Sequence, residues 1–273
     1  MAFDLNEHTH RLLVREPFFA ALSRTIDKAE DKGIPTAGVR VNPTTGYFEL
    51  RYNSDFFEGL SDAERSGVLI HEFYHLVFEH VTGRLPDELA GVMASNSPTQ
   101  AQAQLFKLWN IAADLSINCM IGKSNLPEMC CFPGEGMFED LPEGQTAEWY
   151  FKKLKEKIEE QDEGNGGSGE GGEDSEGEGS GSGTFDPDAA GQFDDHGGWG
   201  EISDDMKEIA KERLKEATKK AAQEASASGS WGSVSSSIRK EIMDRITTKI
   251  DWRKVLRYFV KCSQRAERRS TPK

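Results

Sequence analysis

Residues 61–86 read SDAERSGVLIHEFYHLVFEHVTGRLP, and the rest of the chain has to be arranged around this stretch. Ser61 and Glu64 have the spacing of a capping box, in which each side chain bonds the other residue's backbone N–H, so a helix is predicted to begin at Ser61. We expect it to end near Gly83, before Pro86, because glycine commonly follows helix ends and proline cannot continue a helix. Its apolar residues predict a buried helix: Val68, Leu69, Ile70, Phe73, Leu76, Val77 and Phe78.

This helix carries two histidines one turn apart. His71 and His75 are four residues apart, so both imidazoles lie on one face and can bind a single Zn²⁺. Glu72 then sits beside the metal, where it can take a proton from zinc-bound water. The alternative is a surface helix with two unconnected histidines, but the apolar neighbours favour a buried site in which these polar groups need partners.

A catalytic zinc site usually has a third protein ligand, and residues 105–122, LFKLWNIAADLSINCMIG, contain the best candidate. Asn110, Asp114 and Asn118 recur every four residues in an otherwise apolar helix, so the three side chains share one stripe. Asp114 is the only anion of the stripe and is the predicted ligand. Hydrogen bonds between helices, or to a loop, are the alternative use of the stripe. His80 would lie on the opposite side of the helix of residues 61–83 from His71, which predicts a packing or supporting role.

The remaining apolar patterns predict a mostly helical chain with one β-hairpin. Two runs separated by the turn residues 42–46 have the alternation of paired strands. A helix at the N-terminus should be interrupted near Pro17, which lacks the N–H that a helix interior needs. The expected helices span residues 3–31, 61–83, 98–121, 146–160, 204–224 and 235–263, and the expected strands span 37–42 and 47–52.

The net charge of -14 over 273 residues is concentrated in one segment. Residues 161–195 contain eleven acidic residues and no Lys or Arg, whereas residues 249–273 carry nine basic residues against two acidic ones. A segment rich in Gly, Ser and acidic residues buries too little apolar surface to fold, so it is predicted to be a flexible linker. We therefore expect a core over 1–160, the linker over 161–195, and a helical C-terminal segment over 196–273 that packs on the core.

Composition also excludes several classes of protein. The acidic balance disfavours nucleic acid and anionic membranes as partners, and no apolar run approaches the roughly 18 residues of a membrane span. The N-terminus has no secretory signal pattern. The four cysteines, Cys119, Cys130, Cys131 and Cys262, are too sparse for a disulfide scaffold, which favours a cytoplasmic protein. Buried, inert thiols are the expectation for the adjacent pair Cys130 and Cys131.

Five strings stand out along the chain: HEFYHLVFEH, NIAADLSIN, TAGVRVNPTTGYFELRYNSDFF, DDHGGW and DWRKVLRYF. Together they resemble a metallopeptidase domain family that occurs with VWA-like domains in bacteria and phages, often near MoxR-type AAA+ ATPases. The resemblance implies a zincin-like fold with His71 and His75 as zinc ligands, Glu72 as the base and Asp114 as the third ligand. Members of the family continue into a VWA-like domain after a segment like DWRKVLRYF, whereas this sequence stops at Lys273.

The predicted fold class is therefore α+β, a mostly helical zincin-like domain with a small hairpin or sheet, an acidic disordered insertion and C-terminal helices. The predicted function is zinc-dependent hydrolysis of peptide bonds, in which Glu72 activates metal-bound water. The alternative is a non-catalytic zinc-binding adaptor in an assembly with a AAA+ ATPase or of a phage. A third possibility is that the acidic linker inhibits a host factor. Expected partners are a peptide or protein substrate and a AAA+ ATPase or VWA-type protein.

Two further features could serve a peptidase. His196 stands between two carboxylates and two glycines in FDDHGGW, residues 193–199, and could donate to the oxyanion of the tetrahedral intermediate. A solvated loop histidine, or a histidine that fills the metal's open position, is the alternative. The strand expected over 47–52 could hold an extended peptide by strand addition, although it could equally be a plain structural hairpin.

Overall fold

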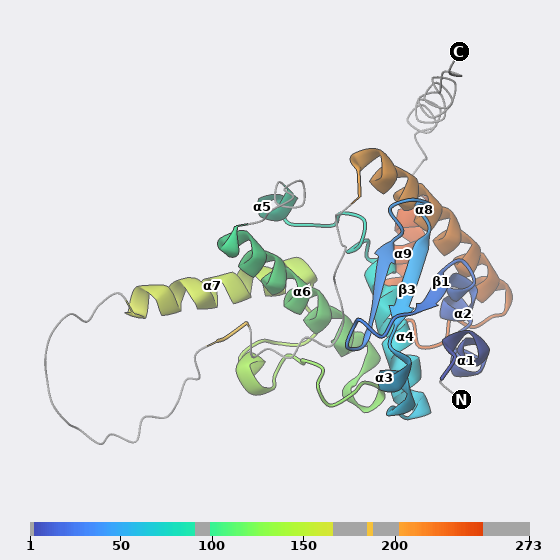
Figure 1. The fold of residues 1–273 in the computed structure, drawn as a ribbon, viewed down its shortest axis with the longest axis horizontal. Coiled ribbons are helices and arrows are strands. Elements are labelled where there is room, and N and C mark those ends of the chain that lie inside the picture. The colour runs from blue at the N-terminus through green and yellow to red at the C-terminus, as the bar shows by residue number, and fades with distance from the viewer. Residues whose placement is uncertain (1–2, 91–98, 166–184, 188–201, 248–273) are drawn as a thin grey trace, which may run out of the picture.

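The computed structural model describes residues 3–90, 99–165, 185–187 and 202–247 (Figure 1). His196, most of the acidic linker and the basic end of the chain lie outside the described residues, so the expectations for them stay predictions. No helix within the described ranges is both long enough and apolar enough to cross a bilayer.

The described chain is mostly helical with one small sheet, which confirms the predicted α+β class. The helices are α1 (Leu5–Leu12), α2 (Pro17–Ser23), α3 (Ser54–Glu58), α4 (Asp62–Val77), α5 (Asp87–Ala90), α6 (Gln100–Ile121), α7 (Ala147–Asn165), α8 (Asp204–Ala227) and α9 (Ser236–Thr247), with short 3₁₀ turns η1 (Lys123–Asn125) and η2 (Gly136–Phe138). The strands are β1 (Asp27–Glu30), β2 (Ala37–Val41) and β3 (Phe48–Tyr52).

The sheet has the order β1-β3-β2. Strands β2 and β3 form the expected antiparallel hairpin, with Val39 opposite Leu50, and the turn closes with Gly46 at a φ of 67°. The expectation of helix up to residue 31 is wrong at its end, because residues 27–30 form β1, which pairs parallel with β3. Pairing with a distant strand satisfies the backbone of this short segment, and local pattern could not reveal that partner.

The position of β3 corrects a second expectation. Both of its edges are occupied, one by β1 and the other by β2. An extended peptide therefore cannot add to residues 48–52 as the sequence suggested. Among the described strands, β1 and β2 form the edges of the sheet, and β2 is the strand that packs on α4.

Helix α4 runs through the larger of two hydrophobic clusters and is capped as predicted. Ser61 Oγ accepts from the Glu64 N–H while the Glu64 carboxylate accepts from the Ser61 N–H, so both donors at the helix start are satisfied. The helix is buried from Gly67 to Val77. Gly67 lies against η1, where a Cβ would stand 1.8 Å from the backbone oxygen of Asn125, so only glycine permits this approach.

The end of α4 differs from the expectation. The helix stops at Val77, six residues before Gly83, because Glu79 adopts a left-handed conformation with φ 63°. The Glu79 N–H donates to the carbonyl of Leu76 and the His80 N–H donates to the carbonyl of His75, which is the hydrogen-bond pattern of a Schellman motif. A glutamate here gives no sequence signal, since this position usually holds glycine.

The helices that follow the acidic linker pack on the N-terminal part of the chain. Helix α8 lies along α2 (Figure 1). Trp231, between α8 and α9, stacks on Phe18 with ring centroids 5.3 Å apart. Ile238 and Ile242 of α9 are buried in the same cluster as α4. Helices α6 and α7 build the second cluster, around the buried rings of Trp109 and Tyr150. Within the described residues, α8 and α9 therefore contact helices of the N-terminal part of the chain.

Candidate metal centre

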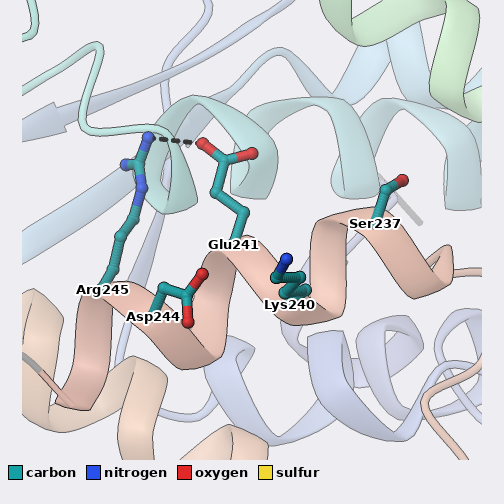
Figure 2. A pocket seen from close by; sticks show the side chains of 5 residues that line it. All are labelled: Ser237, Lys240, Glu241, Asp244 and Arg245. Carbon is teal, nitrogen blue, oxygen red and sulfur yellow. Dashed lines mark hydrogen bonds and ion pairs between the residues drawn. The ribbon is translucent and has the colours of Figure 1, made fainter.

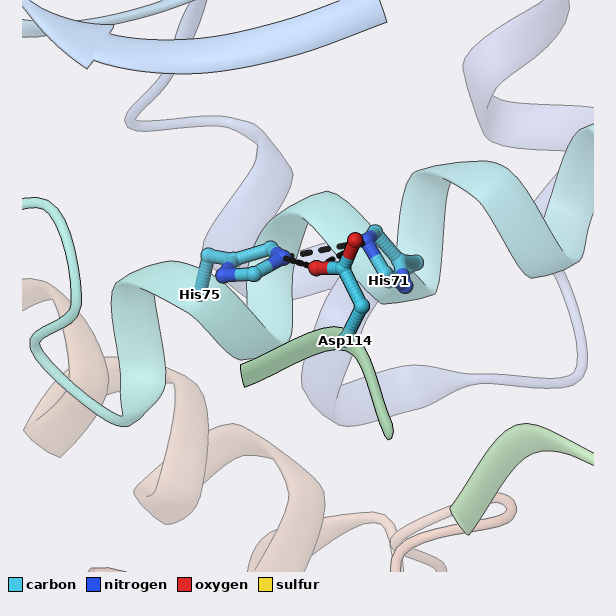
Figure 3. Close-up of side chains that lie close together, drawn as sticks. All are labelled: His71, His75 and Asp114. Atoms are coloured by element: carbon cyan, nitrogen blue, oxygen red, sulfur yellow. Dashed lines mark hydrogen bonds and ion pairs between the residues drawn. The ribbon is translucent and has the colours of Figure 1, made fainter. Parts of the chain in front are cut away.

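The predicted ligands meet where α4 packs against α6 (Figure 3). Helix α4 brings His71 and His75 to the contact, one turn apart, and α6 brings Asp114 to the same point. The two histidines have no solvent exposure and Asp114 is 2% exposed. The structure therefore brings three candidate ligand side chains together in the protein interior, two from α4 and one from α6.

The spacing of the ligand atoms suits a tetrahedral ion. The two Nε2 atoms of His71 and His75 are 3.0 Å apart, and Asp114 Oδ1 lies 3.3 Å from His75 Nε2 and 3.7 Å from His71 Nε2. With metal–ligand bonds of about 2.0–2.1 Å, the ligands of tetrahedral zinc lie about 3.3 Å from one another. The three observed separations bracket that value, so these residues could hold a metal ion without rearranging.

Asn118 orients the first histidine. Its Oδ1 lies 2.9 Å from His71 Nδ1, and because an amide oxygen can only accept, the imidazole must donate from Nδ1. This tautomer leaves the lone pair on His71 Nε2, the atom that faces His75 and Asp114. Asn118 Nδ2 in turn donates to the carbonyl of Cys131 over 2.9 Å, so both ends of the amide are held.

The polar stripe of α6 is only partly used in this way. Asp114 and Asn118 reach the histidines of α4, whereas Asn110 is 3% exposed and its Oδ1 makes no hydrogen bond among the described residues. Sequence reasoning expected the stripe to face one metal. It missed that the vicinal pair Cys130 and Cys131 lies in the loop that supports Asn118. Spacing along the chain carried no signal of that contact.

His80 lies next to the site rather than on the far side of the helix. The expected position assumed that the helix continues past residue 80, but the left-handed Glu79 turns the chain back. As a result His80 Nδ1 lies 3.1 Å from His75 Nδ1, and the side chain is 1% exposed. The predicted position of His80 is therefore wrong, because the helix has already ended at Val77.

Glu72 adds a second carboxylate to this interior region. It follows His71 on α4 and has no solvent exposure. Ionised carboxylates are stable inside a protein only when their charge is compensated. A divalent cation between His71, His75 and Asp114 would compensate negative charge here, and two imidazoles with a carboxylate are donors that zinc accepts.

Comparison with known proteins gives one match. No curated protein and no solved structure matches the chain significantly. A family model described as "Putative metallopeptidase domain" matches residues 3–271, which include α4, α6 and the C-terminal helices. Because the match covers nearly the whole sequence, the chain belongs to this metallopeptidase-domain family.

Proposed function

We propose that the protein is a zinc-dependent metallopeptidase in which His71, His75 and Asp114 hold the metal and Glu72 is the general base. The observation that carries the proposal is the convergence of three ligand atoms, 3.0–3.7 Å apart, from two helices. Membership of a metallopeptidase-domain family supports it. A centre with three protein ligands leaves a fourth position for a reacting group, as catalytic zinc sites do.

The chemistry divides between the metal and the chain. A bound zinc ion would polarise the scissile carbonyl and acidify the attacking water. The Glu72 carboxylate would take a proton from that water as the water oxygen bonds to the carbonyl carbon of the substrate. The same carboxyl group would return the proton to the amide nitrogen as the C–N bond breaks, so that a carboxylic acid and an amine leave. His196, which lies outside the described residues, remains our candidate for the oxyanion donor.

The sheet suggests where an extended substrate would lie. Strand β2 is an edge of the described sheet and packs on α4, which carries the two histidines. We propose that a peptide substrate pairs with β2 rather than with β3. A AAA+ ATPase or a VWA-type protein stays our proposed partner, on the resemblance alone.

Burial of the site favours a second candidate function. Structural zinc sites leave no coordination position open to a reacting group, and here His71, Glu72 and His75 have no exposure. A non-catalytic metal-binding adaptor would use the same three ligands to hold α4 against α6. It would have no use for a carboxylate at position 72, so Glu72 distinguishes the two functions.

One experiment tests both. Purified wild type, Glu72→Gln and Asp114→Ala are compared for zinc content by mass spectrometry and for cleavage of a broad peptide library. We expect one zinc in wild type and in Glu72→Gln, hydrolysis lower by about 10²–10⁴-fold in Glu72→Gln, and loss of zinc in Asp114→Ala. Glu128→Gln, a change at an exposed carboxylate, is the control and should match wild type.

Each result has a defined meaning. A wild-type protein without stoichiometric zinc would contradict the metal site. Zinc binding with equal cleavage by wild type and Glu72→Gln would remove Glu72 from the mechanism. Zinc binding with no cleavage of any peptide by wild type would favour the adaptor.

A further inference from the structure

The C-terminal end of α4 has an unusual construction that bears on the metal centre. Glu79 is the only residue other than glycine with a positive φ among the described residues. A left-handed backbone is unfavourable for a residue with a Cβ, so the surrounding structure must hold it there. At Glu79 the chain reverses direction and folds back over the last helical turn of α4, which brings His80 to His75.

We propose that His80 is a positioning residue that holds the His75 imidazole with Nε2 directed at the metal. The inference rests on the proposed function, since it assigns a support to one of the proposed ligands. Only one of the two facing Nδ1 atoms, 3.1 Å apart, carries the shared proton. When His75 Nε2 binds a metal, its remaining proton is on Nδ1, and His80 Nδ1 is then the acceptor.

In the metal-bound protein the two α4 histidines would thus be supported in the same way from different elements. Asn118 of α6 accepts from His71 Nδ1, and His80, in the turn after α4, would accept from His75 Nδ1 across the 3.1 Å contact. Partners of this kind fix the orientation of ligating histidines, and their removal typically weakens metal binding about 10–100-fold. The centre therefore has an acceptor behind each imidazole.

His80 is itself held firmly. Its ring meets Trp109 of α6 edge to face, with centroids 5.7 Å apart, and lies 5.9 Å from the ring of Phe78. From α9, Arg245 donates to the carbonyl of Val77 over 3.2 Å, which occupies a backbone acceptor at the end of α4.

Arg245 Nη1 also lies 3.9 Å from the Glu79 carboxylate. Arg245 Nη2 donates to the Glu241 carboxylate over 2.7 Å, and Figure 2 shows this pair. Both residues line a shallow surface pocket on α9. The turn that carries His80 is therefore fastened to α6 and to α9.

Two substitutions separate positioning from packing. His80→Phe keeps an aromatic ring against Trp109 but removes the acceptor, whereas His80→Asn keeps an acceptor close to the former Nδ1 position and loses the ring. Zn²⁺ affinity is measured by competition with a chromogenic chelator, and the ligand field by the visible spectrum of the Co²⁺-loaded protein. We expect His80→Phe to lose about 10–100-fold in Zn²⁺ affinity with an altered Co²⁺ spectrum, and His80→Asn to stay within about threefold of wild type.

Glu79→Gly is the matched control for the backbone. It keeps the turn without a Cβ and should bind Zn²⁺ like wild type. Urea unfolding of the metal-free proteins measures any general loss of stability, which should be larger in His80→Asn because it loses the ring.

The outcomes distinguish this inference from the proposed function. Equal Zn²⁺ affinity of wild type and His80→Phe, or a loss in both His80 variants that follows their urea stability, would overturn the positioning role alone. Failure of wild type to bind Zn²⁺ would overturn the metal site and this inference with it.

Discussion

His71 donates from Nδ1 to Asn118 Oδ1 across 2.9 Å, a hydrogen bond that joins residues 47 positions apart. The bond determines which imidazole nitrogen faces the candidate metal, because a neutral imidazole with its proton on Nδ1 has its lone pair on Nε2. The Asn118 side chain cannot flip to present Nδ2 to His71, since Nδ2 donates to the Cys131 carbonyl. The orientation of the His71 imidazole therefore depends on α6 and on the loop after it.

Removing the Asn118 acceptor should weaken metal binding without removing a ligand. For Asn118→Ala we expect Zn²⁺ affinity to fall about 10–100-fold, measured by chelator competition. Asn125→Ala is the control, because that exposed side-chain amide donates to the carbonyl of Ile121, within its own chain segment. Equal affinity of Asn118→Ala and wild type would show that His71 needs no partner.

Substitution of Gly67 should destabilise the fold around α4. An alanine Cβ would overlap the Asn125 backbone oxygen, so α4 and η1 must separate. We expect Gly67→Ala to lose about 1–3 kcal/mol in the free energy of unfolding, even though alanine is the better helix former by about 1 kcal/mol. Urea denaturation measures the change.

Gly59 provides the comparison for that variant. Its φ is −72°, and a Cβ there would lie 3.5 Å from its nearest neighbour, an ordinary contact. Gly59→Ala should therefore be neutral or stabilising by less than about 1 kcal/mol. A Gly67→Ala protein as stable as Gly59→Ala would contradict the close approach of α4 and η1.

The stack of Trp231 on Phe18 tests how firmly the C-terminal helices are attached. Trp231 is 8% exposed and its ring lies nearly parallel to that of Phe18. Trp231→Ala should lower the free energy of unfolding by about 3–5 kcal/mol, whereas Trp231→Phe, which keeps a stacked ring, should lose less than half as much. A single unfolding transition in Trp231→Ala with wild-type stability would contradict the observed packing.

The ion pair of Arg84 and Glu148 predicts a pH-dependent contribution to stability. Arg84 Nε and Nη2 bond the two Glu148 oxygens over 2.6 and 3.0 Å. Partial burial acts to raise the pKa of Glu148, but the hydrogen bond and charge of Arg84, together with hydrogen bonds from the Glu148 backbone and Thr146, lower the pKa overall. A carboxyl whose folded pKa is depressed contributes stability above its unfolded pKa of about 4.3, and the contribution is lost as pH falls through the folded value.

Accordingly, Glu148→Gln should be less stable than wild type at pH 7 by under about 1 kcal/mol, because the side chain is 46% exposed and solvent screens the pair. The difference should shrink as the pH falls below 4. Urea unfolding at pH 7 and at a pH below 4 measures the difference in stability between the two proteins. Glu143→Gln, at an exposed carboxylate, is the control. A difference that grows on acidification would contradict the depressed pKa.

Local sequence patterns predicted those parts of the fold that depend on neighbouring residues. Ser61 and Glu64 cap α4 as expected because a capping box acts within one helical turn. The hairpin of β2 and β3 followed from two alternating runs with a five-residue turn between them. Strand β1 was missed, since its four residues DKAE have no strand pattern and only pairing with β3 makes them extended.

The sequence by itself determined that two imidazoles stand one turn apart on a buried helix, because helical periodicity and apolar content are properties of α4 alone. It also predicted Asp114 as the third metal ligand, because Asp114 is the one anion in an apolar helix. Only the tertiary structure decided that α6 meets α4 at these residues, that Asn118 supports His71, and that the turn at Glu79 returns His80 to His75. Those contacts depend on how the helices pack and on how α4 ends against its neighbours. Packing joins residues that are far apart in the chain, so their spacing in the sequence does not reveal it.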